Sequence, residues 1–247
     1  MRFATPTGSV QALQDVSLTV RPREFVSLLG PSGCGKSTLL RLVSDVLAPT
    51  AGVIHVAGQS PEAARKARTF GFVFQDPTLL AWRSALKNVL LPLEVSGEQR
   101  GADHRAAELL ELVGLKGFES MYPWQLSGGM RQRVSIARAL ITQPQILLMD
   151  EPFGALDEIT RERLNVELLR IWEATGTTIL FVTHSSPEAV FLSNRVVVLT
   201  ARPGRVKLDL PIELPRPRDP AMKDTVEFAH YTATLRRALA AETSEEL

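Results

Sequence analysis

The apolar positions along the chain form short runs that alternate with helical stripes. Nearly continuous apolar runs predict five strands buried on both faces, at residues 25–29, 70–74, 146–149, 179–182 and 195–199. Apolar residues spaced three or four apart predict helices near 105–113, 130–141 and 156–172. Strands that alternate with helices are typical of a mainly parallel sheet covered by helices on both faces, so the sequence predicts an α/β fold.

Two further stretches, 16–20 and 53–56, alternate apolar with polar residues. This period of two predicts half-exposed strands, which we assign to a separate antiparallel β layer. About seventy residues between the second and third buried strands show no β signal. Residues 76–144 are therefore predicted to form an inserted α-helical subdomain, and 1–75 with 145–247 the α/β core of one domain. Five prolines between residues 203 and 220 favour an extended path. A helix is predicted at 226–240, before an acidic end at 243–247 that is expected to fray.

Composition and charge narrow the possible partners. Lys and Arg number 28 against 27 Asp and Glu, which leaves a formal charge of +1, so no nucleic acid partner is expected. The apolar runs are far shorter than the roughly 20 residues that a membrane-spanning helix needs. The one cysteine, Cys34, cannot form an internal disulfide, which favours a reducing, cytosolic setting.

The strongest local motif is GPSGCGKST, which directly follows the strand at 25–29 and precedes an apolar helical stripe. This context is typical of a phosphate-binding loop of the form G-x-x-x-x-G-K-S/T. Its glycines let successive N–H groups point at phosphate oxygens, and the following helix adds its positive end. Lys36 supplies a charge for the β and γ phosphates, and Ser37 can ligate Mg²⁺. The predicted nucleotide-binding residues are Gly30, Pro31, Ser32, Gly33, Cys34, Gly35, Lys36, Ser37 and Thr38.

Two further motifs carry chemistry. Asp150 and Glu151 end the strand at 146–149, where Asp150 can hold Mg²⁺ and Glu151 lies where a water could attack the γ phosphate. Together with the loop they predict a nucleotide hydrolase. The segment LSGGMRQR, 126–133, places Ser127, Gly128 and Gly129 at a helix start, which is a second anion-binding helix N-terminus.

In this order, the motifs resemble those of the ATP-binding subunits of ABC transporters over nearly the whole chain. The shared set comprises the phosphate loop, Gln75 in VFQD, LSGGMRQR, the acids of MDEP, Asp157 in FGALD and His184 in FVTHS. The resemblance implies a P-loop NTPase core. It also implies a homodimer that sandwiches two ATP molecules head to tail, so that Ser127, Gly128 and Gly129 act on the nucleotide of the other subunit.

The same resemblance implies a role for each remaining residue. Glu151 would polarise the attacking water, His184 would contact the γ phosphate, and Gln75 would sense metal and water while linking to the helical subdomain. Mg²⁺ would thus be held by Ser37, Gln75 and Asp150. Asp157 would lie at the dimer seam, and Phe3 is the candidate for stacking on adenine. One departure from the family follows His184, where Ser185 stands in place of a common Asp.

Several segments resemble the nitrate, sulfonate and taurine import group, among them FQDPTLLAWRSALKNV and LPRPR, 214–218. In that group the segment near 79–83 lies close to the membrane partner. Leu80 and Trp82 are therefore predicted to form an exposed apolar patch that receives a short helix of a permease, unless Trp82 is simply part of the core.

The resemblance implies an ATPase that energises an importer for a small solute. It would act at the cytoplasmic face of the membrane, with permease subunits and, through them, a solute-binding protein as partners. The alternative is an ABC-type ATPase of DNA repair or translation. Repair proteins carry a long coiled coil between loop and signature, whereas residues 38–126 are too few and lack sustained heptads.

Overall fold

The computed structural model describes residues 1–5 and 8–240, and the predicted acidic end at 243–247 lies outside this range. The chain divides into two compact units. Unit one comprises residues 1–69 and 178–247, and unit two comprises residues 70–177.

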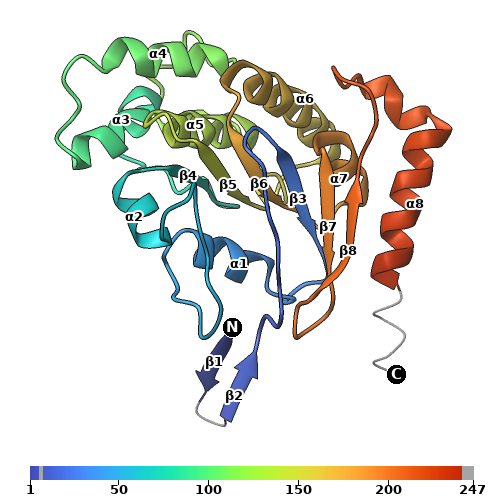
Figure 1. Ribbon diagram of the computed structural model, residues 1–247. Coiled ribbons are helices and arrows are strands. Elements are labelled where there is room, and N and C mark those ends of the chain that lie inside the picture. Colours follow the sequence, from blue (N-terminus) through green and yellow to red (C-terminus); the bar gives the residue numbers. More distant parts are fainter. Residues whose placement is uncertain (6–7, 241–247) are drawn as a thin grey trace. The chain divides into compact units, whose positions relative to one another are not determined.

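Unit one is built around β3 (Phe25–Leu29), which has a parallel neighbour on each side. These neighbours are β6 (Thr178–Val182) and β7 (Arg195–Leu199), and β8 (Val206–Pro211) joins β7 in the antiparallel direction (Figure 1). The side chains of β3 and β6 are buried throughout, as expected for strands covered on both faces. Three of the predicted strands are thereby confirmed.

The helices of unit one are α1 (Lys36–Val43), α2 (Pro61–Lys66), α7 (Ser186–Leu192) and α8 (Val226–Ala240), with a 3-10 turn at Pro220–Asp224. The LPRPR segment has a structural role at the end of α7. Arg216 donates a hydrogen bond to the Leu192 carbonyl at 2.8 Å, and Arg218 donates one to the Ser193 carbonyl at 3.1 Å. Cationic donors at a helix C-terminus satisfy carbonyls that lack a partner within the helix.

An antiparallel layer is present, but it lies at other residues than those predicted from the sequence. It consists of β1 (Arg2–Thr5) and β2 (Gly8–Gln11), whereas residues 16–20 and 53–56 form no strand. Half-buried and exposed positions still alternate at 16–20. An extended backbone has a side-chain period of two whether or not it pairs with a neighbour, so the apolar pattern alone did not distinguish an extended loop from a strand.

Unit two pairs β4 (Phe70–Val73) with β5 (Ile146–Asp150) in parallel (Figure 1). Its helices are α3 (Ala85–Val95), α4 (Asp103–Leu112), α5 (Gly128–Leu140) and α6 (Glu158–Thr175), with a 3-10 turn at Pro123–Gln125. The helical patterns had predicted α4, α5 and α6 but not α3. Pro92 lies inside α3 and Asn88 is buried there, so neither its composition nor its stripe has the usual helical signal.

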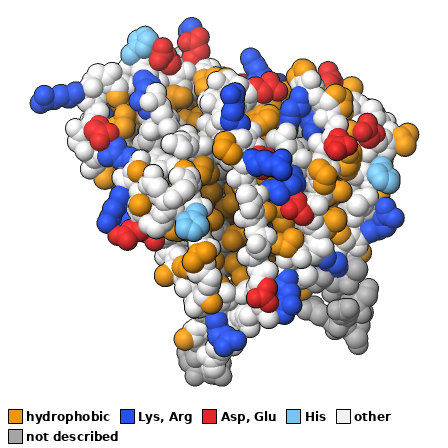
Figure 2. Space-filling model, in the orientation of Figure 1, with side chains coloured by type: hydrophobic (Ala, Val, Ile, Leu, Met, Phe, Trp, Pro, Cys, Tyr) orange, Lys and Arg blue, Asp and Glu red, His pale blue; other side chains and the backbone are white. Residues whose placement is uncertain are grey.

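Charged side chains of both signs lie close together at several places on the face shown in Figure 2. Among the described residues, no helix combines the length and apolar character needed to cross a bilayer. Exposed ion pairs such as Lys66 with Glu62, at 2.6 Å, contribute at most about 1 kcal/mol each. The stability of each unit therefore depends on its buried strands and helix faces.

Gly71 allows α5 to pack directly on β4. A Cβ at this position would lie 2.5 Å from the carbonyl oxygen of Ala139 and 3.1 Å from Leu147 Cδ2. The obstructing oxygen belongs to the backbone, so no side-chain rotation can relieve the overlap. β4 and α5 can therefore approach this closely only because residue 71 is a glycine.

We expect Gly71→Ala to lower the free energy of unfolding by about 1–3 kcal/mol, the usual cost of overpacking, as measured by chemical denaturation. Gly52→Ala is the matched control, because a Cβ there meets nothing within 4 Å, although its φ of +85° adds about 1–2 kcal/mol of strain. A smaller loss for Gly71→Ala than for this control would contradict the steric explanation.

Candidate functional site

The segment from Gly30 to Thr38 leaves the end of β3 and enters α1. Gly33 and Gly35 have φ angles of 75° and 103°, in the left-handed region that glycine adopts without strain. Gly35 is the N-cap of α1 and has no side chain to cap the helix. A helix start of this kind, preceded by a curved loop, directs N–H groups at an anion.

Lys36 lies across the inside of this loop. Its Nζ donates hydrogen bonds to the carbonyl oxygens of Gly30 at 2.7 Å and Pro31 at 2.9 Å. The ammonium is thereby held over the curve of the loop although its side chain is buried. Phosphate oxygens carry negative charge and are stronger acceptors than carbonyl oxygens, so the loop is suited to a phosphate chain.

Close packing of the loop against two distant segments fixes its curvature. A Cβ on Gly35 would lie 2.6 Å from Leu13 Cδ2, and a Cβ on Gly204 would lie 2.0 Å from the Cys34 carbonyl oxygen. The Gly204 N–H also donates to Ala12 O at 2.8 Å. Gly204 is not among the residues predicted from the sequence, although the Pro203-Gly204 pair is a turn signal.

Cys34 packs under the loop. The residue is 1% exposed, and its Sγ lies 3.8 Å from Lys36 Nζ. Burial raises the pKa of the Cys34 thiol, and the charge of Lys36 opposes this shift without cancelling it. Cys34 is one of the residues predicted from the sequence to bind nucleotide. In the structure its side chain fills space beneath the loop, so only its backbone can serve a ligand.

His184 lies at the same sheet edge as the phosphate loop. The Thr183 N–H donates to the Leu28 carbonyl at 3.2 Å, which extends the pairing of β6 with β3 to the residue before His184. Its side chain is exposed. Ser185, which stands where Asp is common, is the N-cap of α7 and accepts the Glu188 N–H at 3.4 Å. Serine and aspartate cap helices equally well, so this departure preserves the helix start.

Phe3 lies in β1, where it pairs with Val10 of β2. Its neighbours Arg2 and Ala4 line a hollow that is also lined by Leu39 and Leu42 of α1. Successive side chains in a strand point to opposite faces, so Phe3 faces away from this hollow. Its contact with adenine stays a prediction.

The two acids stand at the end of β5 in unit two. Glu151 follows Asp150 with a φ of 46°, an uncommon angle for a residue with a Cβ and one that is frequent at functional sites. Gln75 follows β4, the parallel neighbour of β5. A Cβ on Gly154 would lie 3.4 Å from Gln75 Nε2 and 3.5 Å from Glu151 Oε2. The structure thus brings Gln75 and Glu151 close together, over a glycine that the sequence analysis did not select.

Ser127 and Asp157 are the N-caps of α5 and α6. Ser127 Oγ accepts the Met130 N–H at 3.2 Å, and Asp157 Oδ1 accepts the Thr160 N–H at 2.9 Å. This backbone hydrogen bond is the main reason that the pKa of Asp157 lies below its ordinary value. Both side chains are exposed, and a hollow of about 390 Å³ lies between these helices, lined by Ser127, Gly129, Arg133, Thr160 and Glu167 among others.

Gly129 is buried where α5 meets α6. A Cβ there would lie 2.9 Å from Thr160 Cγ2, so this glycine is needed for the close approach of the two helices. A Cβ on Gly128 would lie 3.2 Å from Leu156 Cδ2. The sequence predicts only a ligand-binding role for both glycines, because contacts between helices are not visible in a local motif.

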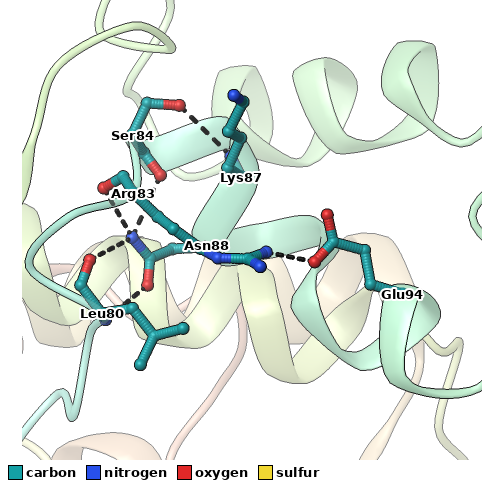
Figure 3. Close-up of polar contacts among 6 residues, drawn as sticks. All are labelled: Leu80, Arg83, Ser84, Lys87, Asn88 and Glu94. Atoms are coloured by element: carbon teal, nitrogen blue, oxygen red, sulfur yellow. Dashed lines mark hydrogen bonds and ion pairs between the residues drawn. The ribbon is translucent and has the colours of Figure 1, made fainter.

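The segment between β4 and α3 lacks regular structure and is held by side chains outside it. Buried Asn88 of α3 accepts the Leu80 N–H at 2.7 Å, and its amide donates to the carbonyls of Leu80, Arg83 and Ser84 (Figure 3). Arg83, which precedes α3, forms an ion pair with Glu94 in that helix (Figure 3). We call residues 80–84 the docking turn.

Trp82 lies in the docking turn and is 72% exposed, so the alternative that it belongs to the core is wrong. Leu80 is partly exposed. The helix α5 holds the preceding residues, because Arg138 donates to the carbonyls of Pro77 at 2.7 Å and Thr78 at 2.9 Å, and Gln132 donates to Phe74 O at 3.0 Å. The segment from Phe74 to Ser84 is therefore fixed to α3 and α5.

Comparisons with known proteins identify the family of this chain. The family model described as ABC transporter matches residues 13–154. A taurine import ATP-binding protein of Jannaschia sp. is 48% identical over 209 residues, which cover 83% of this chain and 77% of that protein. A nitrate import ATP-binding protein of Synechococcus elongatus is 46% identical over 233 residues, which cover 90% of this chain and 82% of that protein.

A solved structure, the dimeric post-hydrolysis state of an ATP-binding cassette bound to ADP and Pi, has a TM-score of 0.74 to this chain. Its sequence is 34% identical, and the alignment covers 87% of this chain and 96% of that one.

The burial of Cys34 leads to a test of the loop's packing. At pH 8 the native thiol should react with a disulfide reagent at least about tenfold more slowly than the thiol of the unfolded chain, because reaction requires an exposed thiolate. The rate should also increase as the pH rises from 7 to 9, because the thiolate fraction grows with pH. Absorbance of the released thiolate measures both rates, and equal rates for native and unfolded protein would contradict the burial.

Proposed function

Since the chain belongs to the ABC transporter family, we propose that it is the ATP-binding and ATP-hydrolysing subunit of an importer for a small solute of the nitrate, sulfonate or taurine type. The phosphate loop, with Lys36 held over its curve, is the observation that carries this proposal. The import proteins that resemble the chain support it over an ABC-type ATPase of DNA repair or translation.

ATP would bind with its phosphates in the loop from Gly30 to Thr38. Lys36 would exchange its loop carbonyls for oxygens of the β and γ phosphates, and Phe3 would stack on adenine. A serine hydroxyl, an amide oxygen and a carboxylate are oxygen donors of the kind that Mg²⁺ prefers, so Ser37, Gln75 and Asp150 fit this ion. When bound, Mg²⁺ would neutralise charge on the β and γ phosphates.

Hydrolysis would require a water aligned with the γ phosphate. Glu151 would act as the general base that holds and polarises this water, with the Gln75 amide beside it. His184 would donate a hydrogen bond to a γ-phosphate oxygen and so stabilise the charge that shifts during transfer. The products would be ADP and phosphate.

A second copy of the chain would complete each ATP site. Ser127, Gly128 and Gly129 would act on the nucleotide held by the partner, and Asp157 would lie at the dimer seam. Ser127 supports this arrangement because its oxygen accepts a bond from Met130, which leaves its single O–H free to be donated to a phosphate. The dimeric cassette of known structure provides independent support.

The docking turn would contact a permease. An exposed tryptophan on a rigid backbone supplies a large contact area with little loss of conformational entropy, which suits a protein interface. The chain would thus lie peripherally at the cytoplasmic face of the membrane, and a solute-binding protein would reach it only through the permease. The helical subdomain at 76–144 would carry both the docking turn and the signature motif.

Glu151→Gln tests the assigned general base. The amide cannot accept a proton, so turnover should fall by about 10²–10⁴, while ATP binding is retained and an ATP-bound dimer accumulates. Phosphate release measures turnover, and sedimentation with and without ATP measures the dimer. Glu173→Gln makes the same chemical change at an exposed position of α6 and should leave both unchanged. Near-normal hydrolysis by Glu151→Gln would remove Glu151 from this role.

Trp82→Ala tests the docking turn. Loss of a central aromatic anchor should reduce co-purification of the subunit with its permease at least about tenfold, while ATP affinity is unchanged. Trp124→Ala is the matched control, because Trp124 is similarly exposed, at 66%, in the same unit. If both variants retained the permease equally, the docking turn would not be the contact.

A further inference from the structure

One buried carboxylate has no role in the mechanism above. The charged side chains buried within the described part of the chain are those of Lys36, Glu188 and Arg218. Lys36 belongs to the phosphate loop, and Arg218 caps the end of α7. Glu188 lies in the first turn of α7 and is 7% exposed. Burial of a carboxylate is costly unless strong hydrogen bonds compensate for lost hydration, so its partners indicate why it is there.

The Thr183 hydroxyl is a partner of Glu188. Thr183 is 2% exposed and lies between the end of β6 and His184, and its Oγ1 contacts Glu188 Oε2. The Ser185 N–H donates to the same Oγ1 at 3.0 Å. Because Oγ1 accepts this bond and a carboxylate only accepts, the Thr183 hydroxyl donates its hydrogen to Glu188.

These two hydrogen bonds enclose His184. The Ser185 N–H bonds the side chain of Thr183, two residues earlier, and so closes a tight turn. His184 is the middle residue of this turn. Thr183 is also tied to β3 through Leu28, and Ser185 is tied to α7 through Glu188. The backbone on either side of the exposed imidazole is therefore fixed by hydrogen bonds.

The arrangement differs from an ordinary capping box. In that motif the acidic residue three positions after the N-cap bonds back to the N-cap N–H. Here the N-cap is Ser185, whose N–H bonds Thr183 instead, and the Glu188 carboxylate bonds the same threonine. The acid thus orients the turn that carries His184 as well as the helix.

We propose that Thr183 and Glu188 are positioning residues for His184. Glu188 fixes the rotamer of Thr183, Thr183 fixes the turn, and the turn directs the imidazole towards the γ phosphate. The inference rests on the proposed role of His184 in hydrolysis. Small errors in the placement of a catalytic group are costly, with losses of up to about 10² for a shift of 1 Å.

Thr183→Val removes the hydroxyl with little change in shape. We expect kcat for ATP to fall at least about tenfold, while KM and ADP affinity change less than about twofold, because the phosphate loop is not altered. Thr183→Ser keeps the hydroxyl and should restore most of kcat. Thr178→Val is the matched control, since Thr178 is a buried threonine at the other end of β6 whose hydroxyl accepts the Arg23 N–H.

A double-mutant cycle separates positioning from general damage. In a His184→Ala background, Thr183→Val should change kcat less than about twofold, because there is no imidazole left to orient. The same tenfold loss in both backgrounds would overturn the inference. Wild-type turnover of His184→Ala would also overturn the inference, because His184 would then have no role in hydrolysis. The ATP binding and hydrolysis proposed for the chain are tested separately by Glu151→Gln.

Thr183→Val also leaves a buried carboxylate with one donor fewer, so its folding is checked by thermal unfolding. If it does not fold, Glu188→Gln decides the matter. This substitution keeps the shape and a weaker acceptor, and it should lower kcat at least about threefold with His184 present and not in its absence. An equal loss in both backgrounds would again overturn the inference.

Discussion

The parallel pairing of buried strands determines where chemistry can occur in this protein. A strand covered on both faces has its polar backbone satisfied by its neighbours, so functional groups gather where the chain leaves the sheet. In unit one, β3 and β6 end at the same edge and deliver the phosphate loop and His184 there. In unit two, β4 and β5 do the same for Gln75 and Glu151.

Features encoded locally could be predicted from the sequence. The strand and helix that flank the phosphate loop, the acids at the end of β5 and the cap at Ser127 all depend on residues within a few positions. Features that depend on the approach of distant segments could not. Gly204 is needed because it meets Cys34, and Gly129 because α6 lies against α5. The misplaced antiparallel layer has a related cause, since pairing depends on a partner that an alternating pattern does not identify.

Polar side chains do much of the positioning in both units. Asn88 and Arg138 hold the irregular segment before α3, and the Thr183 and Glu188 pair holds the turn before α7. An irregular backbone cannot satisfy its own polar groups as a helix does, so side chains that complete its hydrogen bonds also fix its shape. Rigid irregular segments can then present exposed groups, such as Trp82 and His184, in defined positions.

The bonds that hold the docking turn have a consequence for how such subunits diversify. Asn88 donates hydrogen bonds to main-chain carbonyls of the turn, and Arg138 donates to main-chain carbonyls just before it. Every residue type has such a carbonyl. The outward side chains of the turn are therefore free to change without loss of its backbone shape. A lineage could exchange Trp82 and its neighbours to suit a new membrane partner while inheriting the same ATPase, which separates the evolution of partner choice from that of energy conversion.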